Sequence, residues 1–281
     1  MKILTEDAVR HYKEEGFHFP ERVMSAEDAL WYRREVERTC SASANPAEAR
    51  KGTISYRVKP YLLFEWAAEL VRHPRVLDAV EDLIGPDILV FHTTMWWKTP
   101  GSSNRVPWHQ DGTYFGLAPF EHVTAWVALS PSNLETGCVR IVPRTHGDGQ
   151  LPHADVPDPD LMLSRGQTVV LNVDESKAVP VILSPGEISL HHTMAIHASD
   201  PNTGTDDRIG IGISYIPAHV RHVGPTRLTA SLVRGEDRYG HFDLEPRPLS
   251  DLHPDAVAAH RKSDARFWEA SRSIPEMAGI H

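Results

Sequence analysis

Hydrophobic positions in the first third of the chain recur at the spacing of amphipathic helices. We predict helices over residues 5–16 and 25–40, because each opens with a side chain suited to N-capping, Thr5 and Ser25, and acidic residues follow. A third helix is expected over residues 64–84, where a Gly-Pro pair then ends the pattern. The chain therefore begins with a helical region.

From about residue 87 onward the pattern is that of strands. Residues 88–98 are rich in strand-forming side chains. Short apolar segments then alternate with clusters of Gly, Pro, Asn and Asp, at residues 123–129, 138–142, 168–173, 187–190 and 209–216. This rhythm predicts an all-β barrel or sandwich core.

The length of 281 residues and a hydrophobic content of 41% suit one large domain. We expect a single domain over residues 1–281, mainly β with flanking helices. Its parts are a helical preface over about 1–86, a β core over about 87–220, and a C-terminal tail with a closing helix over 221–281.

The predicted strand that begins at Arg208 alternates in an informative way. Isoleucines and a tyrosine fall on one face, while Arg208, Gly210, Gly212 and Ser214 fall on the other. We predict one packed face and one hollow face. Two glycines beside an inward arginine indicate that something other than a side chain approaches the sheet there, or equally that the strand bends at a barrel corner.

Charge and cysteine content narrow the function classes. The net charge of -9 and the pI near 6.0 disfavour binding to nucleic acid or to an anionic membrane. Two cysteines cannot build a disulfide framework and fit a reducing compartment. The charged N-terminus does not resemble a signal peptide, and no window approaches about eighteen apolar residues. We expect a cytoplasmic protein whose partner is a small molecule.

The pattern His-x-Asp is half of the usual two-histidine, one-carboxylate site for iron(II). With 17 histidines in the chain the pattern alone decides nothing, and context must separate its five occurrences. Only the pair His109 and Asp111 stands between strand-like segments in an aromatic setting, a place where rigidly held ligands are expected. The other four pairs begin at His146, His153, His241 and His253.

A second, distal histidine is required, and His197 is the candidate, with His191 and His192 as competitors. Arg208, eleven residues beyond His197, favours His197. Its guanidinium offers a planar fork to the far carboxylate of a 2-oxo diacid, which lysine cannot imitate. The alternative for Arg208 is a surface salt bridge with a neighbouring aspartate.

These residues resemble the phytanoyl-CoA dioxygenase family of iron(II)- and 2-oxoglutarate-dependent oxygenases. The likeness covers nearly the whole chain and includes Glu15-Gly-Phe17, Lys98-Thr-Pro-Gly101, Trp108-His-Gln-Asp111, Glu135 to His146, and Pro185-Gly186 before His197 and Arg208. It implies a double-stranded β-helix (jelly roll, cupin-like) core. One departure is Arg144, where the family usually has glycine; we expect it to alter an entry loop without touching the iron.

The resemblance also implies roles for the site residues. His109, Asp111 and His197 would bind iron(II); Arg208, Ser199 and Trp126 would bind 2-oxoglutarate, which is consumed with O₂. Positions that line the pocket in the similar ectoine hydroxylases match His92, Trp96 and Phe115, for which ordinary core packing is an equal alternative.

Two features bear on the reaction. Aromatic rings beside a histidine would suit a compact cationic or zwitterionic substrate through cation–π contact. Related halogenases lack the carboxylate that Asp111 supplies here, so hydroxylation of a C–H bond is favoured over chlorination.

Three alternatives stay open at this point. One is a cupin-like dioxygenase or isomerase that does not use 2-oxoglutarate, and another is a non-catalytic metal-binding sensor. The third is a true phytanoyl-CoA hydroxylase. It ranks below a small-molecule hydroxylase because the chain shows no basic cluster for the phosphates of CoA.

Overall fold

The computed structural model describes residues 1–41 and 56–273. Helices α1 (Glu6–Glu15) and α2 (Ala26–Ser41) confirm the two predicted at the start of the chain. The Thr5 side chain accepts a hydrogen bond from the amide of Ala8, and Gly16 ends α1 in the left-handed conformation at φ 87°.

The prediction of one helix over residues 64–84 was wrong. The chain forms the short 3₁₀ helix η1 (Pro60–Leu62) and then two α-helices, α4 (Glu65–Leu70) and α5 (Pro74–Ile84). Pro74 explains the break, because proline lacks an amide hydrogen and disfavours helical backbone in the residue before it. It is well placed as the first residue of α5.

The larger of two main sheets has seven strands in the order β1-β10-β5-β12-β2-β14-β15. Strand β2 (Ile88–Lys98) has the predicted bounds, and β12 (Arg208–Pro217) pairs with it along its whole length. The other strands are β1 (Phe17–Arg22), β5 (Val123–Ala128), β10 (Glu187–His192), β14 (Thr229–Arg234) and β15 (Asp243–Leu244).

The smaller sheet has four strands in the order β3-β11-β6-β9. They are β3 (Val106–His109), β11 (His197–Ser199), β6 (Val139–Ile141) and β9 (Val179–Pro180). Two short pairs complete the β structure, β4 (Leu117–Ala118) with β13 (Arg221–His222), and β7 (His153–Asp155) with β8 (Gln167–Val169). Two sheets of this kind, antiparallel except for the β14–β15 pair and with helices outside, confirm a mainly β, double-stranded β-helix fold.

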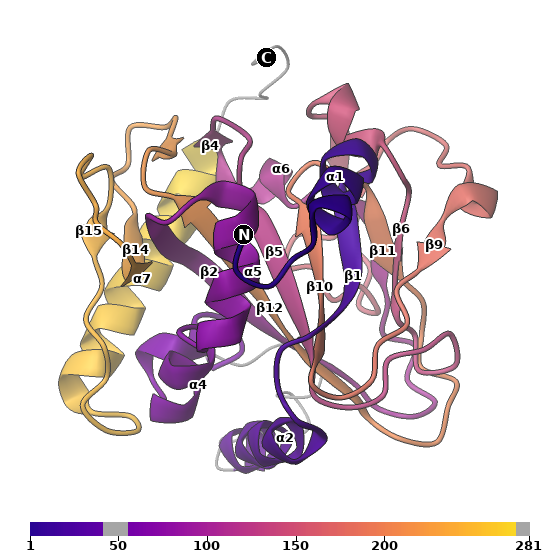
Figure 1. Cartoon of the computed structure of the whole chain (residues 1–281), viewed down its shortest axis with the longest axis horizontal. Coiled ribbons are helices and arrows are strands. Elements are labelled where there is room, and N and C mark those ends of the chain that lie inside the picture. The colour runs from indigo at the N-terminus through magenta and orange to yellow at the C-terminus, as the bar shows by residue number, and fades with distance from the viewer. Residues whose placement is uncertain (42–55, 274–281) are drawn as a thin grey trace.

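The predicted packed face of β12 is confirmed. Ile209, Ile211 and Ile213 belong to a buried cluster with residues of α4 and α5, and these helices lie in front of the large sheet in Figure 1. Helix α7 (Pro254–Ser273) lies beside β14. No described helix is both long enough and apolar enough to cross a membrane.

The opposite face of β12 is not open in the way the glycines suggested. A Cβ built on Gly210 would lie 2.2 Å from Cζ2 of Trp126, so a side chain does approach the sheet at this point. The expectation that no side chain approaches the sheet there was therefore wrong. The glycine provides the space that an indole ring needs against the backbone.

Candidate active site

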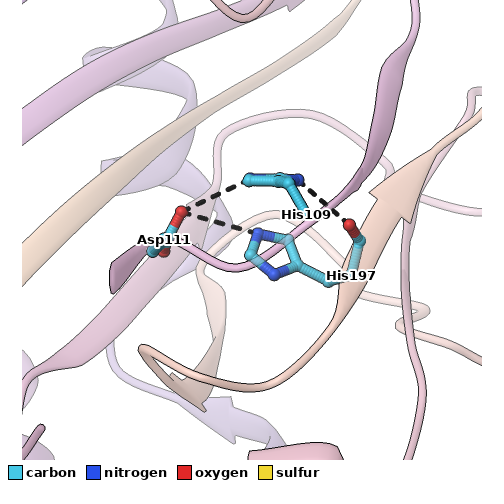
Figure 2. Close-up of side chains that lie close together, drawn as sticks. All are labelled: His109, Asp111 and His197. Carbon is cyan, nitrogen blue, oxygen red and sulfur yellow. Dashed lines mark hydrogen bonds and ion pairs between the residues drawn. The ribbon is translucent and has the colours of Figure 1, made fainter. Parts of the chain in front are cut away.

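The two sheets bring the triad predicted from sequence together. His109 ends β3, Asp111 precedes the short helix α6 (Gly112–Phe115), and His197 begins β11. Antiparallel pairing sets His197 directly opposite His109, so residues 88 positions apart become neighbours. In Figure 2 both imidazole rings point toward the Asp111 carboxylate.

The spacing of the donor atoms fits a single metal ion. One oxygen of Asp111, Oδ1, lies 3.4 Å from Nε2 of His109 and 3.7 Å from Nε2 of His197. The ligand atoms of all three residues lie within 4.8 Å of one another, the one such group among the described residues. Donors bound at about 2.1 Å to one metal lie roughly 3 to 4 Å apart, so this arrangement could hold an ion with small adjustment.

Backbone carbonyls orient the two imidazoles. Nδ1 of His109 lies 2.9 Å from the Pro107 carbonyl, and Nδ1 of His197 lies 3.0 Å from the Ala195 carbonyl. A carbonyl oxygen only accepts, so the ring hydrogen sits on Nδ1 in each case and the Nε2 lone pair faces the centre of the site. This is the arrangement that metal-binding histidines require.

The charges of the site also suit a cation. Burial raises the pKa of Asp111, but the neighbouring imidazoles of His197, His109 and His191 hold that pKa well below its usual range. Burial lowers the pKa of His197 well below its usual value. An ionised carboxylate beside a neutral imidazole is the protonation state in which these groups bind metal.

Three of the other four His-x-Asp pairs have other partners in the fold, and in the fourth His253 and Asp255 lie 3.8 Å from each other. His146 lies 3.1 Å from the Lys13 carbonyl, and Asp155 pairs with Arg165. Asp243 pairs with Arg227 and Arg266. The context argument that selected His109 and Asp111 therefore agrees with where the structure places these residues.

The triad opens into a cavity of about 50 Å³ between the two sheets. Its lining includes most of the residues predicted for the site, namely His109, Asp111, His197, Arg208, Ser199, Trp126 and Trp96. His92 and Phe115 are not part of this lining; they pack against each other at 5.4 Å and against Phe267 of α7.

Arg208 forms the cationic end of this cavity. Its side chain is 1% exposed, its guanidinium lies 5.1 Å over the Trp126 ring, and it donates to the Gly137 carbonyl. The predicted alternative, a surface salt bridge with Asp206 or Asp207, was wrong, because Asp206 pairs with Arg33 and no described carboxylate pairs with Arg208. Burial lowers the pKa of Arg208 to about 10.

Lys98 is a second buried basic side chain that the sequence reasoning missed. Its Nζ donates to Oγ of Ser199 at 2.7 Å and to the carbonyls of Ser199 and Asp200. Burial and the nearby Arg208 lower its pKa to about 6. The sign in the sequence was a lysine at the end of a mostly apolar strand. Arg208, Ser199 and Lys98 form a polar group that fits an anionic ligand.

Arg144, the departure from the family pattern, lies away from the triad. Its backbone is left-handed at φ 67°, a conformation that glycine adopts freely. Its guanidinium pairs with the carboxylate of Glu15, and its amide donates to the Glu15 carbonyl. The arginine therefore joins this turn to the end of α1, as expected for a residue outside the metal site.

Comparison with known proteins gives the same result as the geometry. Residues 12–210 match the family model for phytanoyl-CoA dioxygenase (PhyH). Peroxisomal phytanoyl-CoA dioxygenase of Homo sapiens is 28% identical over 240 residues, which cover 79% of this chain and 71% of that protein.

Two solved structures extend the comparison. The non-heme monooxygenase ThoJ is 32% identical, with a TM-score of 0.80, and the match covers 95% of this chain and 98% of that one. A structure of CytC3 with Fe(II) and alpha-ketoglutarate is 24% identical, with a TM-score of 0.63 over 86% and 93% of the two chains, and shares the fold.

Fold and site together define the class of non-haem iron oxygenases built on a double-stranded β-helix. The chain belongs to the phytanoyl-CoA dioxygenase family. It is an enzyme, an iron(II)- and 2-oxoglutarate-dependent dioxygenase. This assignment decides against the two alternatives of an oxygenase or isomerase without 2-oxoglutarate and of a non-catalytic sensor.

Proposed function

We propose that this dioxygenase hydroxylates an unactivated C–H bond of a small polar or zwitterionic metabolite or natural-product intermediate. His109, Asp111 and His197 would hold iron(II). Arg208, Ser199 and Trp126 would bind 2-oxoglutarate, and His92, Trp96 and Phe115 would contact the substrate. The observation that carries the proposal is the single cavity that joins the triad to the buried Arg208.

The chemistry of the cavity supports the cosubstrate assignment. Among the described residues Arg208 has no carboxylate partner, and its Nε is buried without a hydrogen-bond acceptor. A buried guanidinium in this state favours a bound anion, and its fork matches a carboxylate. Ser199, whose Oγ lies 3.4 Å from the guanidinium, could add a hydrogen bond to the same group.

When bound, iron(II) and 2-oxoglutarate supply with O₂ an oxidant that converts a substrate C–H to C–OH, while 2-oxoglutarate becomes succinate and CO₂. The chain's own residues provide binding and orientation. Arg208 would fix one end of the cosubstrate, and the Nδ1 hydrogen bonds of the two histidines fix the ring planes. Trp96 and Trp126 wall the cavity and limit the entry of water.

Asp111 supports hydroxylation over halogenation. A halide would need the coordination position that its carboxylate can fill, and Thr124 holds that carboxylate by donating to Oδ2 at 2.7 Å. Oxygen transfer to carbon is therefore the outcome that this donor set favours.

The substrate class rests on the aromatic wall and on the overall charge. Trp96 lines the cavity, and Phe115, outside that lining, packs between His92 and His122. Faces of this kind attract a cationic group. The net charge of -9 disfavours a CoA thioester, whose phosphates need basic side chains.

Succinate release under ¹⁸O₂ tests this function. Purified protein with iron(II) and 2-oxoglutarate would be offered zwitterionic amino-acid derivatives in one series and acyl-CoA thioesters in another. We expect only the first series to stimulate succinate release and to yield a product heavier by one ¹⁸O atom, with none formed by His109→Ala. Stimulation by acyl-CoA alone would overturn the substrate class.

We further propose that residues 1–281 form one domain, with the preface, core and tail predicted from the sequence. The low cysteine count supports a cytoplasmic location. Fractionation of cells that express the tagged protein tests the location.

A further inference from the structure

His191 is a buried histidine beside the triad, on strand β10. It is 2% exposed, and neither ring nitrogen has a formed hydrogen bond to any described residue. Its Nε2 lies 3.5 Å from Oδ2 of Asp111, and its ring centre lies 4.6 Å from that of His197. A buried imidazole with two unsatisfied nitrogens is costly, so a functional partner is expected.

Sheet register places His191 and Thr124 at the same carboxylate oxygen. The two residues are directly opposite in the β10–β5 ladder, so their side chains project from the same face of the sheet. Oγ1 of Thr124 donates to Oδ2 of Asp111 at 2.7 Å, and Nε2 of His122 lies 3.4 Å from the same hydroxyl. Three side chains thus gather on the Oδ2 side of the carboxylate.

The other oxygen of Asp111 has a different environment. Oδ1 lies 3.4 Å from Nε2 of His109 and 3.7 Å from Nε2 of His197. The group whose donor atoms are mutually close contains these three residues and leaves His191 out. His191 therefore has the position of a residue that acts on a metal ligand, and it is not itself placed as a ligand.

We propose that His191 is a positioning residue for Asp111. Nε2 of His191 donates to Oδ2, and together with Thr124 it holds the carboxylate so that Oδ1 alone faces the metal. The present 3.5 Å separation is longer than a hydrogen bond, and contacts in catalytic sites often shorten in the loaded complex. Fixing the carboxylate in this way leaves the remaining metal positions clear for the cosubstrate. The inference rests on the proposed triad.

Metal affinity without 2-oxoglutarate tests this role. Co(II) would be titrated anaerobically into the full chain and followed by its visible absorption. His191→Phe keeps a ring and removes both nitrogens, and we expect it to weaken binding roughly 10- to 100-fold, the usual effect of losing such a contact. Thr124→Val should have a similar effect, and the double variant should lose less than the sum, because both act on one oxygen.

Two further variants separate positioning from packing. His191→Gln carries an amide nitrogen at a similar reach, so it should restore much of the affinity that His191→Phe loses. His18→Phe, the same change on the adjacent strand β1, should leave Co(II) binding unchanged. Unfolding in urea would verify that all variants are folded.

The proposal is overturned if His191→Phe binds Co(II) as tightly as the parent, or if the glutamine variant binds no better than the phenylalanine variant. Failure of the parent to bind Co(II) would overturn the triad and this role together. A parent protein that binds Co(II) but not 2-oxoglutarate would contradict the proposed function and leave the role of His191 unaffected.

Discussion

The guanidinium of Arg208 lies over the indole of Trp126, with Cζ 5.1 Å from the ring centre. The two side chains reach the cavity from the paired strands β12 and β5. Gly210 lies beneath the indole, and the indole leaves no room for a Cβ at this position. The position of the arginine therefore depends on an aromatic ring that rests against a glycine.

Gly210→Ala tests this dependence. The added Cβ would lie 2.2 Å from Cζ2 of Trp126, so the indole must move. We expect 2-oxoglutarate affinity to fall about tenfold, equivalent to about 1.4 kcal/mol, and stability to fall by about 1 to 3 kcal/mol. Calorimetric titration and urea unfolding measure the two effects.

Gly147→Ala is the matched control, since nothing lies within 4 Å of its Cβ position, and it should bind and unfold like the parent. Normal 2-oxoglutarate binding by Gly210→Ala would show that the indole does not position Arg208.

Gln110, between the two near ligands, is predicted to stabilise the loop that carries them. Its fully buried amide donates to the carbonyls of Gly149 and Met194 and accepts from the amide of Leu151. Gln110→Leu leaves these groups unsatisfied, so we expect a loss of about 2 to 4 kcal/mol in the free energy of unfolding. Urea denaturation followed by fluorescence measures it.

Gln150→Leu makes the same change three residues before strand β7, at a buried amide oxygen without a described partner, and should alter stability by less than about 1 kcal/mol. Equal losses in the two variants would argue against a specific role for Gln110.

A buried ion pair next to strand β14 is predicted to stabilise the fold. Lys59 donates to Glu245 at 2.8 Å, and Tyr61 donates to the second oxygen of that carboxylate. Lys59→Met removes the cation and leaves a buried charge, at a cost of about 3 to 5 kcal/mol at pH 7. The exposed Lys177→Met should change stability by less than about 1 kcal/mol.

The pH dependence of that effect follows from Glu245. Burial raises its pKa, but the Lys59 ammonium and the surrounding hydrogen bonds bring the pKa below the ordinary 4.5. A lowered pKa contributes stability above that value and loses it as the pH falls through the folded-state pKa. The stability difference between the parent and Lys59→Met should therefore shrink below pH 4.5. A difference that grows toward acid would contradict this assignment.

Local patterns were sufficient to predict much of the fold. The β-branched and aromatic run gave the bounds of β2, and caps located α1 and α2. Pro74 divided the third helix although its apolar spacing continued across the break. The short strand β11 was not predicted, because three residues carry too little periodicity.

Some residues of the candidate site could also be predicted from local patterns, and others could not. His109 and Asp111 are near in sequence. Arg208 follows His197 by eleven residues and suits the far carboxylate of a 2-oxo diacid, so these residues could be predicted. His191 becomes a neighbour of Asp111 only through the register of β10 on β5, which no local pattern specifies. Lys98 reaches Ser199 in the same indirect way, across two sheets.

Anaerobic titration of iron(II) and then 2-oxoglutarate into the full chain tests the central claim most directly, with Arg208→Ala and His109→Ala alongside. We predict the weak visible charge-transfer band of a chelated 2-oxo acid in the parent. In Arg208→Ala the band should require at least about tenfold more 2-oxoglutarate to develop, because the bidentate carboxylate contact is lost. In His109→Ala the band should be absent. Iron binding without any band in the parent, or an unchanged band in both variants, would contradict the account.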